Sequence, residues 1–295
     1  MGDLIFSALR KLARSYPDLL TDIANIPGVI PLYEFLYEKT KPRGTILIEC
    51  EGNKMYVNTD DRYIGPLLIM QAYERQQTRL FKGILGPGMV VLDIGANIGY
   101  YSLIAARIVG PAGTVYAFEP EPRNHELLVK NINLNGYSNV TPIQKAVSNK
   151  HGKVRLFIDR VNLGAHSFSR DNNEKNAGSI EVEATTVDDF LGGLSQDNEV
   201  DLIRMDVEGA EGLVIEGANH TLRNSNVKLM MEFSPRQLRN VGTDPQRLLR
   251  DLRDQGFRPR VVDEFNRCIK DGEGMDIVRA CEKARYGHLE LFLER

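Results

Sequence analysis

The sequence predicts an α/β protein built on a doubly wound, Rossmann-like sheet, and three observations lead to this prediction. From Met89 onward, apolar runs that suit buried parallel strands alternate with amphipathic segments of helical length. A glycine-containing turn joins the first of these runs directly to a helical pattern. The 295 residues are also enough to bury a sizeable core, in one large domain with an appendage or in two modest domains.

The chain before this alternation, residues 1–85, is expected to form an N-terminal extension of helices and a short β-hairpin. Apolar residues recur at helical spacing up to about Thr40, with basic residues between them. Such a helix is expected to dock on the body of the protein or on a partner subunit, and docking on a partner would form a homo-oligomer. The alternative is a helix that lies on a membrane surface. The hairpin is expected at Thr45–Glu49 and Lys54–Val57, and a further helix at Ile69–Leu85.

Residues 86–295 are expected to form the sheet domain, with helices on both faces of the sheet. Its strands are expected at 89–94, 114–118, 140–143, 201–205, 227–233, 258–262 and 288–293. Its helices are expected near 99–109, 122–134, 209–223 and 235–255. An insertion is expected to form a small hairpin from Val154–Ile158 and Ile180–Ala184, which flank a polar loop.

Composition and charge argue against several classes of protein. The net charge of −3 lacks the basic excess of nucleic-acid-binding proteins, so no nucleic-acid partner is expected. No run approaches the ~20 apolar residues of a transmembrane helix, so no transmembrane segment is expected. The 3 cysteines are widely spaced, which predicts neither a disulfide framework nor a cysteine-based zinc site. A reducing, cytoplasmic location is therefore expected.

The turn after the first strand carries the first candidate binding residues. Gly95 allows a tight turn and lets the backbone approach a ligand that a Cβ atom would exclude. Asn97 is a residue type that tolerates left-handed dihedral angles, and Gly99 ends the turn. Asp93 is expected to accept hydrogen bonds from loop amides or to bind the amine of an amino-acid ligand.

The next strand ends in Glu119, about two dozen residues after Gly95. An acidic residue there accepts hydrogen bonds from both hydroxyls of a ribose, as in dinucleotide and S-adenosylmethionine sites. The dinucleotide fingerprint has a further glycine where this chain has Tyr100, and a pyrophosphate needs a bare helix N-terminus. The short spacing from Gly95 to Gly99 instead suits a ligand without phosphate. The alternative without function is a βα turn that binds nothing.

A second cluster lies at the junction of an expected strand and helix, where the chain places Asp206, Glu208 and Glu211. Ligands bind beyond the carboxyl ends of strands in an open α/β sheet, so this cluster and the glycine turn are expected to share one cleft. Asp206, at the strand's end, is the first candidate for a catalytic base. Glu208 and Glu211 are expected on one helical face, where they could instead cap the helix. The carboxylates could also hold a divalent cation, although no metal ligands are assigned.

Two further residues join the catalytic candidates. His166 lies in a polar loop of the insertion that could cover the cleft, and it is either a base or a solvated side chain. Glu232 ends an apolar strand, and because a buried acid needs a partner, it is expected to line the acceptor pocket. The other histidines, His125, His151, His220 and His288, have no supporting sequence context.

Three motifs make the chain resemble the FkbM family of S-adenosylmethionine-dependent methyltransferases. They are residues 91–102 around Asp93-Ile94-Gly95-Ala96-Asn97, then Phe118-Glu119-Pro120, then Asp206-Val207-Glu208-Gly209-Ala210-Glu211. Weaker similarities lie at Tyr73-Glu74, Asn162-Leu163-Gly164 and Met231-Glu232-Phe233. The resemblance covers about residues 50–265 and leaves the N-terminal helices without an assigned role.

The resemblance implies a seven-stranded sheet whose last strand is antiparallel. It implies methyl transfer to a small molecule such as a sugar, a polyketide or a peptide natural product, usually at oxygen and in some relatives at nitrogen. By motif matching, the glycine turn would hold the methionine part of the cofactor and the acidic motif its ribose. The implied cofactor residues are Asp93, Gly95, Ala96, Asn97, Gly99, Glu119, Pro120, Ala146 and Val147, the last two beside the adenine.

The sequence therefore predicts an S-adenosylmethionine-dependent methyltransferase that transfers the methyl group in line to a hydroxyl. One alternative is an N-methyltransferase that acts on a peptide or a small molecule. Another is a NAD-dependent oxidoreductase on a similar sheet, against which Tyr100 counts. A third is a binding module that has lost its activity, against which the acidic cluster counts. The candidate catalytic residues are Asp206, Glu208, His166, Glu211 and Glu232.

Overall fold

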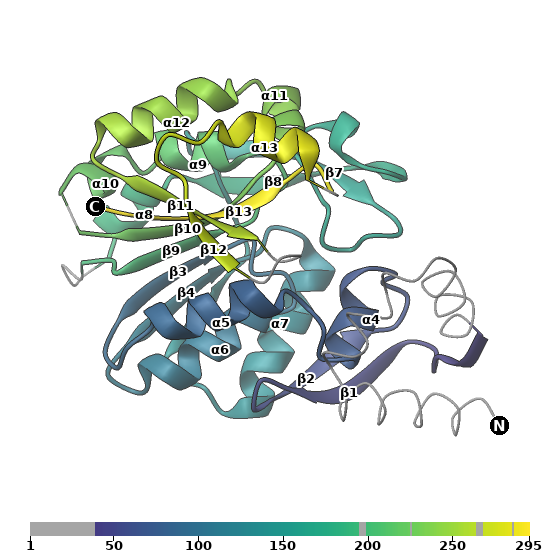
Figure 1. Ribbon diagram of the computed structural model, residues 1–295. Coiled ribbons are helices and arrows are strands. Elements are labelled where there is room, and N and C mark those ends of the chain that lie inside the picture. Colours follow the sequence, from purple (N-terminus) through teal and green to yellow (C-terminus); the bar gives the residue numbers. More distant parts are fainter. Residues whose placement is uncertain (1–38, 195–198, 225, 264–267, 285) are drawn as a thin grey trace.

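The computed structural model describes residues 39–194, 199–224, 226–263, 268–284 and 286–295 (Figure 1). The helices expected at the N-terminus, and with them their docking to a partner or to a membrane, fall on residues 1–38 and lie outside the described residues. Within the described part of the chain, no helix is long and apolar enough to cross a membrane.

A mixed eight-stranded sheet forms the centre of the molecule. In spatial order its strands are β12 (Cys268–Asp271), β11 (Arg258–Asp263), β13 (Leu289–Glu294), β10 (Lys228–Phe233), β9 (Leu202–Met205), β3 (Val90–Ile94), β4 (Thr114–Phe118) and β5 (Val140–Ile143). Neighbouring strands from β5 to β10 are parallel, whereas β13 is antiparallel to both β10 and β11. The predicted α/β class is confirmed, together with the seven expected strands. The eighth, β12, is a short and mostly exposed edge strand, and its polar sequence gave no strand pattern.

Helices cover both faces of this sheet, as predicted (Figure 1). One face carries α8 (Val187–Gly192), α9 (Glu211–Glu216), α10 (Asn219–Asn224), α11 (Pro235–Val241), α12 (Pro245–Asp254) and α13 (Ile277–Lys283). The other carries α5 (Arg75–Ile84), α6 (Tyr100–Val109) and α7 (Pro122–Asn135). All of β3 is buried, and its side chains alternate between two apolar cores, Leu92 in one and Val91 in the other. The end of β3 therefore lies between the ends of β9 and β4.

Three of the expected helices are interrupted. The segment 209–223 forms α9 and α10, which are separated at Gly217. The segment 235–255 forms α11 and α12, because Gly242 ends the first helix at a φ of +97° and Asp244 caps the second. The helix expected over Ile69–Leu85 is present only from Arg75 to Ile84, as α5, because α4 (Ile64–Ile69) stops at the expected start and α5 begins after Glu74.

The two hairpins predicted from the sequence are confirmed. β1 (Thr45–Cys50) pairs with β2 (Asn53–Asn58), and β2 packs on α7, where the Asn131 side chain hydrogen-bonds the Tyr56 backbone at 2.6 and 3.1 Å. In the insertion, β7 (Gly152–Asp159) pairs with β8 (Asn176–Thr185), and β6 (Ala146–Val147) lies parallel to β8. A short 3₁₀ turn, η1 (Arg170–Asn172), lies in the loop between β7 and β8. The domain boundary at residue 85 stays a prediction.

Candidate functional site

The turn after β3 adopts the left-handed conformations that its residues predict. Gly95, Asn97 and Gly99 have φ values of +83°, +50° and +97°. The amides of Gly95 and Ala96 both donate to the Phe118 carbonyl, at 3.0 and 2.8 Å, and so fix the turn on the end of β4. A Cβ atom on Gly95 would overlap the backbone carbonyl oxygen of Asp206. Glycine is therefore required here by the close approach of the chain after β9, a reason other than the ligand approach expected from the sequence.

The carboxyl group of Glu119 lies directly on this turn. Its Oε2 accepts from the Asn97 amide at 2.8 Å, and its Oε1 accepts from the Glu121 amide at 2.9 Å. The residue is only 6% exposed, and burial raises its pKa to about 8 against the opposing effect of the two amide hydrogen bonds. The two sequence-predicted halves of the cofactor site, the glycine turn and the acid after the next strand, thus lie in hydrogen-bond contact.

The other predicted cofactor residues surround this contact in different ways. Asp93 is fully buried and accepts from the Ser102 hydroxyl at 2.5 Å, instead of from the amides of the turn. Burial raises the pKa of Asp93, and the nearby Arg204 opposes the shift. Ala96 is buried, Pro120 is half-buried, and Ala146 and Val147 are buried in β6 just after β5. The direct contribution of these residues to a ligand stays a prediction.

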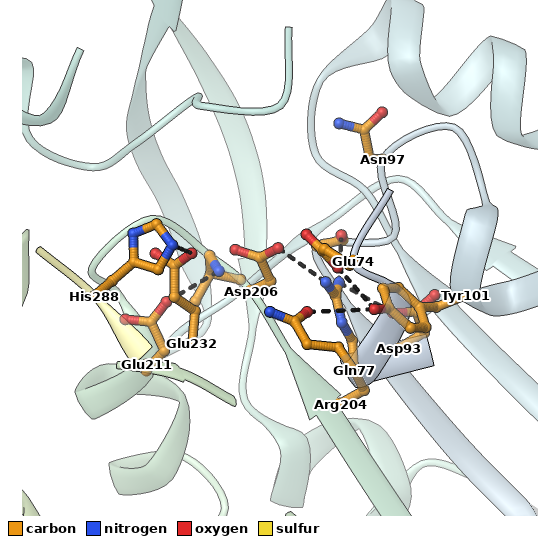
Figure 2. A network of polar contacts seen from close by, with 12 residues as sticks. Glu74, Gln77, Asp93, Asn97, Tyr101, Arg204, Asp206, Glu211, Glu232 and His288 are labelled. Carbon is orange, nitrogen blue, oxygen red and sulfur yellow. Dashed lines mark hydrogen bonds and ion pairs between the residues drawn. The ribbon is translucent and has the colours of Figure 1, made fainter. Parts of the chain in front are cut away.

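A buried arginine joins the glycine turn to Asp206 of the acidic motif (Figure 2). The Arg204 side chain, 5% exposed on β9, donates to Asp206 at 2.8 Å and to the Gly95 carbonyl at 3.3 Å. Its guanidinium also lies over the Tyr101 ring, 4.4 Å from the ring centre, and 3.6 Å from Asp93. One cation therefore fixes residues that follow two neighbouring strands, β3 and β9.

The same network reaches the segment before the sheet domain. The Tyr101 hydroxyl donates to Glu74 at 2.7 Å, and Gln77 lies 3.3 Å from the same hydroxyl. Burial raises the pKa of Glu74 to about 7, although the charge of Arg204 opposes this shift. Glu74 has a φ of +40°, an uncommon conformation for a residue other than glycine. The residues before the sheet domain thus contribute to the polar network beside Asp206.

Sequence reasoning missed Arg204, Tyr101 and Glu74 as site residues. A signal for Arg204 was present, since a single charged residue inside the apolar strand 202–205 must find partners when it is buried. Glu74 was noticed only as part of the Tyr73-Glu74 similarity. Its approach to Arg204 depends on the long-range packing of α5 on α6, which no local pattern predicts.

The three carboxylates of the second motif differ in their surroundings. Asp206 keeps 22% of its side chain exposed, Glu208 is also partly exposed, and Glu211 is fully buried. Glu211 begins α9, and its Oε1 accepts from the amides of Val207 and Gly209 at 3.1 and 3.3 Å. These contacts favour the capping role that the sequence left open for Glu211.

Glu208 does not lie on a helical face with Glu211, so that expectation is wrong. It occupies the turn before α9 with a φ of +53°, a conformation that costs a residue other than glycine about 1–2 kcal/mol. Its carboxyl group accepts a short hydrogen bond from the Gln237 amide at the start of α11. Burial raises the pKa of Glu208 well above its ordinary value, and the neighbouring charges of Asp206 and Glu211 raise it further.

Glu232 has a partner that the sequence did not indicate. His288 Nε2 lies 3.7 Å from Glu232 Oε2, across the antiparallel pair of β10 and β13. Burial raises the pKa of Glu232 well above its ordinary value, with Asp206 and Glu208 adding to the shift. Burial lowers the pKa of His288. His288 had no supporting sequence context because its neighbour Glu232 belongs to another strand, β10.

The surroundings of His166 disfavour its predicted role as a base. Its Nδ1 accepts from the Asp159 amide at 3.1 Å, and burial lowers its pKa to about 4. The ring is therefore neutral near pH 7 and carries its proton on Nε2, which leaves no free lone pair to take a proton. The alternative of a solvated side chain does not hold either, since the ring is mostly buried.

The described residues contain no group of three or more histidine, cysteine, aspartate or glutamate side chains arranged to hold a metal ion. The divalent cation that the acidic motif suggested therefore gains no support from the geometry of these carboxylates.

Comparisons with known proteins show the family of this chain. The profile of the methyltransferase FkbM domain matches residues 93–259, which span the glycine turn, Glu119, Arg204 and the acidic motif. Methyltransferase 1 of Beauveria bassiana is 27% identical over 143 residues, which cover 43% of this chain and 57% of the relative. The 2-O-methyltransferase NoeI of Sinorhizobium fredii is 26% identical over 179 residues, which cover 56% of this chain and 71% of NoeI.

Methyltransferase sdnD of Sordaria araneosa is 28% identical over 157 residues, which cover 44% of this chain and 60% of the relative. The chain thus spans less than two thirds of the length of two of these three relatives. A solved structure of a methyltransferase FkbM from Methylobacillus flagellatus aligns with 76% of this chain and 51% of its own, at 14% identity and a TM-score of 0.42.

Proposed function

The chain belongs to the FkbM methyltransferase family, and from this premise we propose that it is an S-adenosylmethionine-dependent methyltransferase. The observation that carries the proposal is the contact between the Glu119 carboxyl group and the Asn97 amide. A ribose acceptor and a left-handed backbone turn, at the ends of two adjacent parallel strands, are what an adenosine ligand with an amino-acid arm needs. The residues present fit this cofactor, because each Glu119 oxygen has a second lone pair for a ribose hydroxyl.

The positions of the residues suggest which part of the cofactor each would bind. Glu119 would accept hydrogen bonds from the ribose, the backbone of Gly95–Gly99 would follow the methionine part, and Ala146 and Val147 would flank the adenine. When bound, the cofactor supplies an electrophilic methyl group on a sulfonium. Alignment of the acceptor with that methyl group can lower the barrier by about 7–11 kcal/mol in favourable cases.

We propose Asp206 as the base, because it is the accessible carboxylate at the end of β9 and it is oriented by Arg204 at 2.8 Å. An acceptor hydroxyl that takes the methyl group would pass its proton to an Asp206 carboxylate oxygen, and the sulfur would leave as a neutral thioether when the carbon–sulfur bond breaks. Arg204 keeps that carboxylate in place beside the glycine turn, since it also donates to the Gly95 carbonyl. Glu208 and Glu232 would line the acceptor side, and Glu211 would hold the turn by capping α9.

For the acceptor we propose a hydroxyl on a sugar or another small natural product. Support comes from the relative named as a 2-O-methyltransferase, and from the partly exposed Asp206 carboxylate that Arg204 orients. A second candidate is an amine acceptor. Besides Asp206 the same edge carries Glu208, Glu211, Glu232 and Glu290, whose carboxyl oxygens can accept hydrogen bonds from an amine.

Thermal-shift titration tests the cofactor assignment. S-adenosylhomocysteine is expected to raise the melting temperature in a concentration-dependent way, whereas NAD is expected to have no effect. Stabilisation by NAD alone would overturn the proposal. Radiolabelled S-adenosylmethionine, incubated with panels of oligosaccharides, polyketides and amines, then tests the acceptor. Label recovered on amines and absent from every hydroxyl compound would replace O-methylation by N-methylation.

A further inference from the structure

The backbone of Glu208 is held from the insertion between β7 and β8. The Ser167 hydroxyl donates to the Glu208 carbonyl at 2.6 Å, and the Asn172 side-chain amide donates to the same oxygen at 2.9 Å. Both donors are buried, Ser167 completely. One peptide carbonyl, at a residue with a left-handed φ of +53°, is therefore fixed by two side chains that lie about 40 residues earlier in the chain.

These two donors are themselves held in place. The Asn172 amide lies 3.0 Å from the Ser167 hydroxyl, and its oxygen accepts from the Asn240 side chain at 2.8 Å. Ser167 also exchanges backbone hydrogen bonds with Phe157 on β7, at 2.8 and 3.1 Å. The insertion thus presents a rigid pair of donors to the turn before α9, supported from β7 on one side and from α11 on the other.

The conformation of Glu208 decides where its carboxyl group lies. In the left-handed conformation the carboxyl group meets the Gln237 amide on α11, and Gly209 follows with a φ of +99°. A Cβ atom on Gly209 would meet the Gln237 carbonyl at 2.5 Å, so the turn and α11 approach too closely for another residue. Without its two donors, the Glu208 peptide could rotate to the negative φ that residues other than glycine prefer, and the carboxyl group would leave Gln237.

We propose that Ser167 and Asn172 are positioning residues, which hold Glu208 in this conformation and so place its carboxyl group on the acceptor side of the cleft. The proposal rests on the proposed function in so far as Glu208 belongs to an acceptor site. It makes the insertion a part of that site, through the backbone it holds, whereas His166 beside Ser167 faces the Asp159 amide.

The first test needs no acceptor. Hydrogen exchange of the full chain, followed by mass spectrometry of a peptide covering 206–211, is compared in Ser167→Ala and Ser169→Ala. Ser169 is the matched control, because its hydroxyl accepts from the Asp171 amide within the same loop and does not contact Glu208. Ser167→Ala is expected to speed exchange at 206–211 by about fivefold, the factor for one ordinary hydrogen bond, and Ser169→Ala is expected to leave it unchanged. Equal exchange in both variants would overturn the proposal.

Should Ser167→Ala fail to fold, Asn172→Ala removes the second donor and is judged by the same criterion.

A double-mutant cycle then asks whether Ser167 acts through Glu208. With a compound methylated by the wild type, Ser167→Ala is expected to lower kcat about tenfold, with KM for S-adenosylmethionine unchanged. In the Glu208→Gln background, the same substitution is expected to have little further effect. Independent, additive losses would contradict the proposal. A wild type that methylates nothing would contradict the proposed function instead, while the exchange result would still decide whether Ser167 holds Glu208.

Discussion

Replacing Asp206 by asparagine removes the proposed base and leaves a side chain of nearly the same shape. The asparagine oxygen can still accept from Arg204, whose guanidinium donates to Asp206 at 2.8 Å and to the Gly95 carbonyl at 3.3 Å. The cofactor side of the cleft is therefore expected to keep its geometry. The loss of a positioned base is expected to lower kcat by about 10²–10⁴-fold.

The same substitution also weakens a charged hydrogen bond. Arg204 keeps Asp93 at 3.6 Å, and Asp206 is 22% exposed, so the loss of stability is expected near the lower end of the range for such bonds, about 1–2 kcal/mol. For a chain of this size that corresponds to a fall in melting temperature of roughly 2–8 °C. The matched control is Asp251→Asn, which breaks an exposed pair with Arg247 at 3.5 Å and is expected to change neither stability nor turnover.

Steady-state methyl transfer and calorimetric binding of S-adenosylhomocysteine measure the two effects separately. A kcat within threefold of the wild type would remove Asp206 from the mechanism. A large loss of S-adenosylhomocysteine affinity together with the loss of turnover would show that Asp206 serves the cofactor, and the proposed role as base would then be wrong.

Three further predictions concern the cofactor side. Glu119→Ala is expected to weaken S-adenosylhomocysteine binding by roughly 10–100-fold, since the hydrogen bonds to both ribose hydroxyls are lost, and an unchanged Kd in calorimetry would refute the ribose assignment. Because burial raises the pKa of Glu119 from 4.5 to about 8, the folded protein without cofactor keeps a proton that the unfolded chain loses. The free energy of unfolding measured in urea is therefore expected to fall by about 3–5 kcal/mol as the pH rises from about 4.5 to 8. In Glu119→Gln this dependence of stability on pH is expected to be weaker. The same pH dependence in both proteins would contradict the assigned pKa. Gly95→Ala is expected to lower the melting temperature much more than Gly242→Ala. Both glycines have positive φ, but only at Gly95 would an added Cβ atom overlap another backbone atom, the Asp206 carbonyl oxygen. Equal falls in melting temperature would contradict that packing.

The parts of the fold that the sequence predicted well are those with strong local signals. The buried strands β3 and β4 are mostly apolar, and the glycine turn that follows β3 has its residues at fixed spacing. The helix breaks at Gly217 and Gly242 were missed because an apolar periodicity continues across each turn. The polar edge strand β12 was missed because it buries almost nothing and so shows no alternation.

The site residues also differ in how well the sequence predicted them. The contact between Glu119 and the glycine turn could be predicted, since adjacent parallel strands bring their carboxyl ends together. The network around Arg204 could not be predicted, because its partners Glu74, Asp93 and Asp206 come from three separate segments. The left-handed conformation of Glu208 was also beyond the sequence, because it depends on Ser167 and Asn172 of a distant hairpin. The local sequence around Glu208 and Gly209 predicts the start of a helix and gives no sign of a left-handed residue.

A crystal structure of the protein with S-adenosylhomocysteine bound tests the central claim most directly. The account predicts both ribose hydroxyls within about 3 Å of the Glu119 carboxylate, and the amino-acid arm along the backbone of Gly95–Gly99. A ligand bound elsewhere, with the Glu119 carboxyl group hydrogen-bonded only to the amides of Asn97 and Glu121, would contradict this claim.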